Sequence, residues 1–316
     1  MQAHLDADDA HFDGVRRGAP VIGCILSTGA TSDDTIRAHV ELARSRGLDV
    51  AVRVAWEHGA AGRIASDFVD EGAERIVVVG GDGTGHEVVD ALARRDALAR
   101  IEFALVAGGT GNDFARSLGD AAPDLVQALT SRITRPVDAI AVGDRLALNA
   151  ATLGHATSST RNAPNGLKQS LGRFAYLVQA VLDASDVHPF YVDLTADDRV
   201  WDGDVWGVAV CNGRTVGGGL SLAPSARIDD GLLDVVLLPA DATPTLEAVA
   251  SMMSRDRPDR SSALRLKANS VRLEFATEIP LHVDGEFDEV RSLDVHVRPA
   301  AIQLVVGDGP IPASVA

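Results

Sequence analysis

Residues 77–87 read Val-Val-Val-Gly-Gly-Asp-Gly-Thr-Gly-His-Glu, and this stretch decides the fold. The valine run is typical of a buried strand, and the glycines that follow end it. Helical spacing of apolar residues then resumes at Val88, Val89 and Leu92. Glycine lets backbone N–H groups approach phosphate oxygens, and a helix N-terminus adds partial positive charge. The stretch therefore predicts a nucleotide-phosphate loop, although an ordinary strand-to-helix turn shows the same pattern.

A second glycine run, residues 108–116, reads Gly-Gly-Thr-Gly-Asn-Asp-Phe-Ala-Arg and repeats the strand, loop and helix design. The apolar stretch 103–106 before it is typical of a strand. Loops at the ends of neighbouring parallel strands lie at one edge of the sheet, so the two runs predict a single phosphate cleft. Asp82 in the first loop gains nothing beside bare phosphates, and its carboxylate therefore indicates a bridging Mg²⁺.

At these two motifs the chain resembles the diacylglycerol-kinase-like lipid kinases, whose hallmarks are a GGDGT loop and a GTxNDFAR segment. The resemblance covers residues 21–306 and is strongest to the YegS-like bacterial lipid kinases, whose second-strand segment looks like residues 53–59. Further segments follow in the family's order: Asn212, 217–219, 223–224, 229–234 and 284–286.

Strand and helix patterns alternate through Leu118, which predicts an α/β N-terminal domain with a parallel sheet. After Arg135 and Pro136, short alternating strands predict a mostly antiparallel β-sandwich C-terminal domain, interrupted by helices around 171–182 and 246–253. The resemblance implies the NAD kinase/diacylglycerol kinase-like fold. The expected parts are an N-terminal extension (1–19), an ATP-binding α/β domain (20–136), a β-rich lipid-substrate domain (137–301) and a last strand within 302–316 that returns to the first domain.

The resemblance also implies which residues bind ATP. They are Gly80, Gly81, Asp82, Gly83, Thr84, Gly85, His86, Glu87, Thr110 and Asn112. Asp82 is expected to help hold catalytic Mg²⁺, while Asp113 and Arg116 are expected to line the substrate cleft. From the residues alone, a turn-forming or helix-capping role for Thr110 and Asn112 stays open, as does a solvated surface position for Arg116.

The segment Asp284-Gly285-Glu286 lies between apolar strand residues. The resemblance implies that Glu286 is the catalytic general base for the lipid hydroxyl, assisted by Asp284 through orientation or metal contact. Their spacing of two residues would put both carboxylates on one side of an extended strand. An Asp-Gly pair is also the usual chemistry of a tight hairpin turn.

The acidic run at Asp229 and Asp230 is the third candidate site, although an acidic turn that binds nothing has the same pattern. In related kinases this segment carries a second, structural Mg²⁺. The resemblance transfers its ligands to the Asp230 carboxylate and to the carbonyls of Arg227 and Leu232, and oxygen ligands of this kind suit Mg²⁺.

Three places depart from the family's pattern. Residues 26–31 read Leu-Ser-Thr-Gly-Ala-Thr where many members have an Asn-Pro-x-Ser-Gly turn, so Ser27 to Thr31 form an atypical first nucleotide loop. Ala55 stands where a threonine often faces the nucleotide, and His86 replaces a common asparagine. Each lost neutral hydrogen bond would weaken ATP binding by about 1 kcal/mol.

Composition restricts the partners. Among 316 residues, 46% are hydrophobic and 23% charged, which is typical of a globular chain of about two domains. The net charge of −16 argues against nucleic acid, because binding to a phosphate backbone needs a basic surface. No apolar run approaches the ~20 residues of a transmembrane span. With only Cys24 and Cys211, far apart, we expect no disulfide framework and a cytoplasmic protein, peripheral to the membrane during turnover.

These observations predict an ATP- and Mg²⁺-dependent lipid kinase that phosphorylates a hydroxyl group of a glycerolipid or related lipid. NAD kinase, which shares a GGDG loop, and a catalytically weak nucleotide- or lipid-binding regulator are the alternatives. Homodimers are common in the family, which makes a homodimer an expectation of the resemblance.

Overall fold

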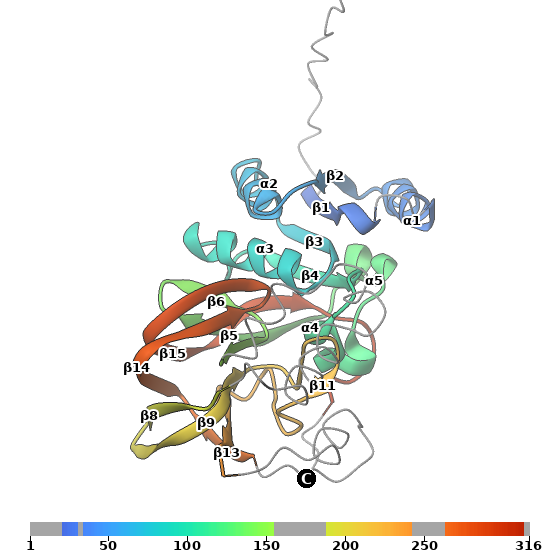
Figure 1. Cartoon of the computed structure of the whole chain (residues 1–316). Helices are drawn as coiled ribbons and strands as arrows, with labels where there is room; N and C mark the ends of the chain where they lie inside the picture. Colours follow the sequence, from blue (N-terminus) through green and yellow to red (C-terminus); the bar gives the residue numbers. More distant parts are fainter. Residues whose placement is uncertain (1–20, 31–33, 155–187, 242–262, 313–316) are drawn as a thin grey trace, which may run out of the picture.

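A computed structural model describes residues 21–30, 34–154, 188–241 and 263–312 (Figure 1). The expected N-terminal extension and the helices expected around 171–182 and 246–253 lie outside the described residues. The elements are β1 Val21–Ser27, η1 Thr28–Ala30, α1 Asp34–Ser45, β2 Asp49–Ala55, α2 Ala60–Asp70, β3 Arg75–Gly80, α3 Asp82–Arg94, β4 Glu102–Ala107, α4 Asp113–Leu118, η2 Gly119–Ala121, α5 Leu125–Thr130, β5 Thr134–Val142, β6 Arg145–Ala147, β7 Ala150–Leu153, β8 Phe190–Ala196, β9 Arg199–Cys211, β10 Thr215–Val216, β11 Leu220–Ser221, β12 Leu233–Pro239, β13 Leu264–Ala268, β14 Ser270–Val283 and β15 Glu286–Val305.

The N-terminal part is a parallel sheet in the order β2-β1-β3-β4 with helices on both faces. Successive side chains of a strand point to opposite faces, and β3 is apolar on both. Ile76 and Val78 pack toward α2 and α3, whereas Val77 and Val79 pack toward α1 and α5. This arrangement explains the unbroken apolar run that precedes the first glycine loop.

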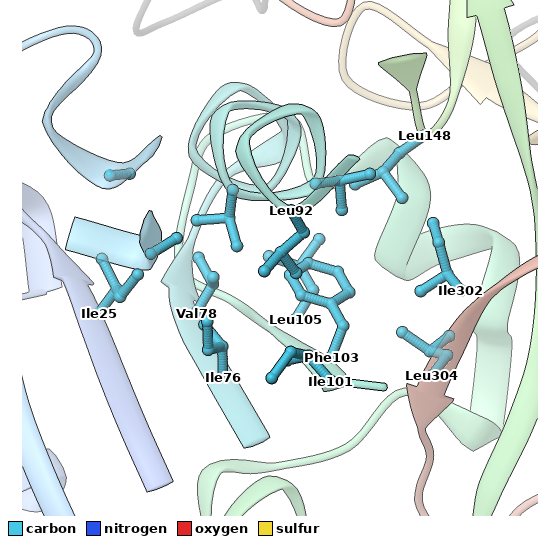
Figure 2. Packing of buried hydrophobic residues seen from close by; sticks show 14 of the residues in the cluster. Ile25, Ile76, Val78, Leu92, Ile101, Phe103, Leu105, Leu148, Ile302 and Leu304 are labelled. Carbon is cyan, nitrogen blue, oxygen red and sulfur yellow. The ribbon is translucent and has the colours of Figure 1, made fainter. Parts of the chain in front are cut away.

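The core on the α3 side reaches beyond the parallel sheet. Figure 2 shows Ile76 and Val78 of β3 beside Phe103 and Leu105 of β4, under Leu92 of α3. Further along in the same cluster lie Ile302 and Leu304 from β15 and Leu148 from the segment between β6 and β7. Residues from both halves of the sequence therefore share one buried cluster.

The C-terminal part is built from antiparallel strands, which lie below α3 in Figure 1. β14 pairs with β15, β7 and β8, and β9 pairs with β12, which pairs with β13. Strand β15 is 20 residues long and links the two parts. It pairs antiparallel with β14 and β5, and near its end Gln303 and Leu304 pair in parallel with β4. The exact limits of the expected domains stay a prediction.

No helix within the described ranges is long and apolar enough to cross a membrane.

Candidate functional site

The two glycine loops lie against each other at the carboxyl ends of β3 and β4. The Gly108 N–H donates to the Gly80 carbonyl at 2.9 Å. A Cβ at Gly109 would lie 2.5 Å from the Cα of Gly81, so the two backbones meet where a side chain does not fit. Helix α3 starts at Asp82, directly after this contact, and no side chain caps its N-terminus. Its first N–H groups therefore form an anion-binding end beside both loops.

Two aspartates fasten the loops through backbone N–H groups. The Asp82 carboxylate accepts hydrogen bonds from the N–H groups of Asp113 and Phe114, both at 2.9 Å, at the start of α4. The Asp113 carboxylate accepts from Gly218 and Gly219, both at 2.8 Å. Burial raises the pKa of Asp113, and the negative charge of Asp82 acts in the same direction. Three segments far apart in the sequence are joined in this way.

The oxygen donors around Asp82 fit a magnesium ion that arrives with a nucleotide. Within the described ranges, no three His, Cys, Asp or Glu side chains are grouped closely enough to hold a metal ion by themselves. Each Asp82 oxygen accepts one hydrogen bond and keeps a lone pair, and Mg²⁺ usually takes one or two carboxylates and completes its shell with phosphate and water. Asp82 is the residue that would hold the ion.

The second glycine loop is braced by its own side chains. Asn112 is the N-cap of α4 with φ 54°, and its amide forms two hydrogen bonds with the backbone of Gly109, at 2.9 and 2.7 Å. Arg116 donates from Nε to the Gly111 carbonyl at 3.0 Å. The Asn112 side chain makes no capping bond to α4, so it has the turn-forming role that the sequence left open, and Thr110 is exposed. Contacts of Thr110 and Asn112 with ATP, and of Arg116 with the substrate, stay predictions.

Glu87 is the residue of the first motif whose side chain turns away to another element. Its carboxylate accepts from the N–H groups of Gly59 and Ala61, at 2.8 and 3.1 Å, and so caps the start of α2. The His58 imidazole lies 3.0 Å from the same carboxylate. The structure thus gives Glu87 a structural task, and its contact with ATP stays a prediction.

Asp284 is part of a two-residue hairpin turn between β14 and β15. Its φ is 44° and that of Gly285 is 117°, so the hairpin interpretation of the Asp-Gly pair is confirmed. The Asp284 carboxylate accepts from the N–H groups of Leu148, Asn149 and Ala150, at 2.6, 3.1 and 2.9 Å. The expectation that Asp284 and Glu286 share one side of an extended strand is wrong, because Asp284 lies in the turn.

Glu286 is the first residue of β15, and its side chain is 30% exposed. Three basic groups face its carboxylate oxygens: His58 Nε2 at 3.7 Å, His86 Nε2 at 3.9 Å and Arg145 Nη1 at 3.5 Å. The turn before it touches the first glycine loop, because a Cβ at Gly285 would lie 3.6 Å from the Cα of Gly83. The structure therefore brings Glu286 to the edge of the phosphate loops.

His86 lies buried between the two carboxylates of this segment. Its Nδ1 is 3.8 Å from Asp284 Oδ2, and this nitrogen has no hydrogen-bond partner within the described part of the chain. Burial raises the pKa of Asp284, while His86 and the backbone N–H groups oppose that effect. The imidazole faces Asp284 and Glu286, so a contact of His86 with phosphate stays a prediction.

Sequence reasoning did not single out His58 or Arg145. His58 belongs to the 53–59 segment that carried part of the resemblance, and this was its one signal. Arg145 is on β6 and also binds Asp288 at 2.8 Å. Nothing in the local sequence relates either residue to Glu286, because the contacts depend on the packing of distant elements.

The acidic loop, residues 229–232, is a separate place with different partners. The Asp230 carboxylate accepts from the Leu232 N–H at 3.2 Å and from the Lys267 ammonium at 2.9 Å. Arg227 pairs with Asp229 at 3.0 Å. The Lys267 ammonium on Oδ2 would compete with a divalent ion for this carboxylate, and the Mg²⁺ site formed by Asp230 and the carbonyls of Arg227 and Leu232 stays a prediction.

Comparison with known proteins identifies the family. A protein of Pseudomonas aeruginosa (strain UCBPP-PA14) named "Probable lipid kinase YegS-like" is 37% identical over 283 residues, which cover 89% of this chain and 92% of the relative. A protein of the same name from Xanthomonas oryzae pv. oryzae (strain MAFF 311018) is 33% identical over 290 residues, 89% of this chain and 94% of the relative. The chain belongs to the YegS-like lipid kinase family.

Family models agree with this assignment, and a solved structure shows the same fold. The diacylglycerol kinase catalytic domain matches residues 25–143 of this YegS-like protein, and the YegS C-terminal NAD kinase beta sandwich-like domain matches residues 152–306. A crystal structure of a diacylglycerol kinase from Bacillus anthracis str. Sterne has a TM-score of 0.75 at 22% identity and covers 93% of this chain and 98% of its own. The expected fold class is confirmed, and the expected kinase class is confirmed at the level of the family.

Proposed function

We propose that this YegS-like protein is an ATP-dependent lipid kinase, which transfers the γ-phosphate of ATP to a hydroxyl group of a glycerolipid or related lipid with the help of Mg²⁺. The observation that carries the proposal is the position of Glu286. Its partly exposed carboxylate follows a turn that packs against Gly83 of the first glycine loop. A carboxylate beside a phosphate loop is the arrangement that transfer to an alcohol requires.

The nucleotide phosphates would bind where the two glycine loops meet. The uncapped N-terminus of α3 and the backbone of Gly80 to Gly83 supply N–H donors without side-chain interference. Asp82 would hold Mg²⁺, and the ion would neutralise the negative charge that develops on the phosphates during transfer. The aspartate network to Asp113, Gly218 and Gly219 keeps these donors in place before the nucleotide binds.

Glu286 is the carboxylate that suits the general base, because its neighbours are already engaged. Asp284 receives three backbone N–H groups, and Asp82 and Asp113 receive two each. The hydrogen bond between Glu286 and Arg145 is long, at 3.5 Å, and leaves the carboxylate accessible. Glu286 would accept the hydroxyl proton of the lipid as the oxygen attacks the γ-phosphate, while Arg145 and His58 orient the carboxylate.

A lipid acceptor places the reaction at a membrane surface, and we propose that the protein binds there peripherally during turnover. A homodimer stays a prediction.

The test is the transfer of labelled γ-phosphate from ATP and Mg²⁺ to a mixed lipid extract in micelles. We expect a labelled lipid with the wild type, and a kcat about 10²- to 10⁴-fold lower with Glu286→Gln, at unchanged ATP affinity. Glu289→Gln, an exposed glutamate on the same strand, is the matched control and should keep full activity. A wild type that binds ATP without labelling any lipid contradicts the proposal, and formation of NADP from NAD and ATP would assign a NAD kinase instead.

A further inference from the structure

Lys267 is a lysine on the outer strand β13 whose ammonium group reaches into the acidic loop. Its partner in the β12–β13 register is Asp234. Nζ donates to Asp234 Oδ2 at 2.8 Å and to Asp230 Oδ2 at 2.9 Å. The side chain of Asp234 is 7% exposed and that of Asp230 is 20% exposed. One ammonium group therefore bridges two carboxylates that are largely removed from water.

The remaining groups of the loop bind backbone or an exposed arginine. Asp138, on β5, accepts from the N–H groups of Gly231 and Ala300, at 2.7 and 2.8 Å. Burial raises the pKa of Asp138, and the charge of Asp230 adds to this effect. Asp230 of the loop therefore lies close to two carboxylates, Asp138 on β5 and Asp234 on β12. Lys267 is the cation that binds Asp230 and Asp234.

We propose that the Lys267 ammonium is the built-in cation of this loop and replaces a divalent ion there. A Mg²⁺ bound to Asp230 through Oδ1 would lie on the same carboxylate as the ammonium group on Oδ2, and the two cations would repel each other where water is partly excluded. The loop therefore does not bind Mg²⁺, whatever the magnesium concentration. Mg²⁺ would then contribute nothing to the stability of this loop.

This inference does not depend on the acceptor or on catalysis, so its test uses the nucleotide-free, full-length chain. Thermal unfolding is measured in EDTA and in excess MgCl₂, and Mn²⁺ binding is measured by electron paramagnetic resonance. The variants are Lys267→Met, which removes the charge at similar length, Lys267→Arg, which keeps it, and Asp230→Asn, alone and combined with Lys267→Met.

We expect the wild type and Lys267→Arg to unfold at the same temperature with and without Mg²⁺. Lys267→Met should unfold several degrees lower in EDTA and recover in Mg²⁺, since an ion that binds only the folded state raises its stability. The recovery should vanish in the double variant, which lacks the carboxylate ligand. If Mg²⁺ does not raise the unfolding temperature of Lys267→Met, the proposal that Lys267 replaces a divalent ion is wrong.

A comparison of the wild type with Asp230→Asn decides the matter if Lys267→Met does not fold. Mn²⁺ binding to the nucleotide-free wild type that disappears in Asp230→Asn would show that a divalent ion and Lys267 occupy the loop together, and would overturn the proposal. Equal Mn²⁺ binding by the wild type and Asp230→Asn supports it.

Discussion

The nucleotide edge, formed by the glycine loops and the 284–285 turn, and the acidic loop 229–232 both depend on aspartates, but they hold them differently. At the nucleotide edge, Asp82, Asp113 and Asp284 accept hydrogen bonds from backbone N–H groups. In the acidic loop, Asp230 is bound by the side-chain ammonium of Lys267. Backbone donors neutralise little charge, so Asp82, Asp113 and Asp284 have no cationic partner among these bonds, whereas Asp230 is paired with a cation.

The difference shows why carboxylates alone identify a metal site poorly. Both regions combine acidic residues with glycines in sequence, and for both the family resemblance predicted a Mg²⁺. What distinguishes them is a lysine from another strand, which approaches Asp230 through sheet pairing. A backbone N–H donor leaves the charge of a carboxylate in place, whereas the ammonium group of a lysine neutralises it.

We expect the largest loss of stability from removing the Asp284 carboxylate, which accepts hydrogen bonds from buried backbone N–H groups. Asp284→Ala leaves the N–H groups of Leu148, Asn149 and Ala150 unpaired, and each unpaired buried donor costs about 1–3 kcal/mol. We expect the free energy of unfolding, measured with urea, to fall by at least about 3 kcal/mol. Asp197→Ala, which removes an exposed carboxylate bound to Asn269 and Ser270, is the control and should cost less. Equal costs would contradict the claim that burial makes Asp284 essential.

The sequence predicted the features that depend on neighbouring residues. The apolar run of β3, the glycines after it and the helical spacing from Val88 lie within one short stretch, so the parallel sheet and the contact between the two loops could be inferred. The contacts that organise Glu286 could not. His58, Arg145 and Glu286 come from three distant elements, and a basic residue on a strand carries no mark of its eventual partner. The same holds for Lys267, whose approach to Asp230 depends on the register between β12 and β13.

A smaller effect is expected where the two glycine loops meet. A Cβ in Gly109→Ala would lie 2.5 Å from the Cα of Gly81 and push the loops apart, whereas a Cβ in Gly83→Ala meets nothing closer than 3.6 Å. We expect Gly109→Ala to lower the free energy of unfolding by about 1–3 kcal/mol and to weaken ATP binding, measured by calorimetry. Gly83→Ala should leave the free energy of unfolding nearly unchanged. If Gly109→Ala is as stable as Gly83→Ala, the close contact of the loops is not required.

Arg145 is the exception within the nucleotide edge, because here a side chain, rather than the backbone, contacts a carboxylate. Arg145→Met removes its contacts with Glu286 and Asp288, and we expect kcat to fall about 10-fold at constant KM for ATP, since the base loses its orientation. The free energy of unfolding should change by less than about 1 kcal/mol, because the Asp288 side chain is half-exposed and the contact with Glu286 is long. Arg272→Met, which breaks a pair between exposed side chains, is the control for both measurements. A change in KM alone would mean that Arg145 binds the nucleotide rather than positioning Glu286.

The smallest expected effect is on the pH dependence of stability, which should differ between the two regions. Burial lowers the pKa of Lys267, but Asp234 and Asp230 more than offset this, so the pKa lies above its ordinary value of 10.5. A raised lysine pKa stabilises the folded state at every pH below the unfolded pKa, and this contribution is lost as the pH rises through the folded value. The free energy of unfolding of the wild type should therefore fall more steeply above about pH 10.5 than that of Lys267→Met, by under about 1 kcal/mol because the ammonium is partly exposed. The backbone donors of the nucleotide edge do not titrate in this range, so Asp284→Asn should keep the alkaline slope of the wild type. If the free energy of unfolding of Lys267→Met has the same alkaline slope as that of the wild type, the ammonium group does not stabilise the folded loop. The two regions would then differ in geometry but not in their contribution to stability.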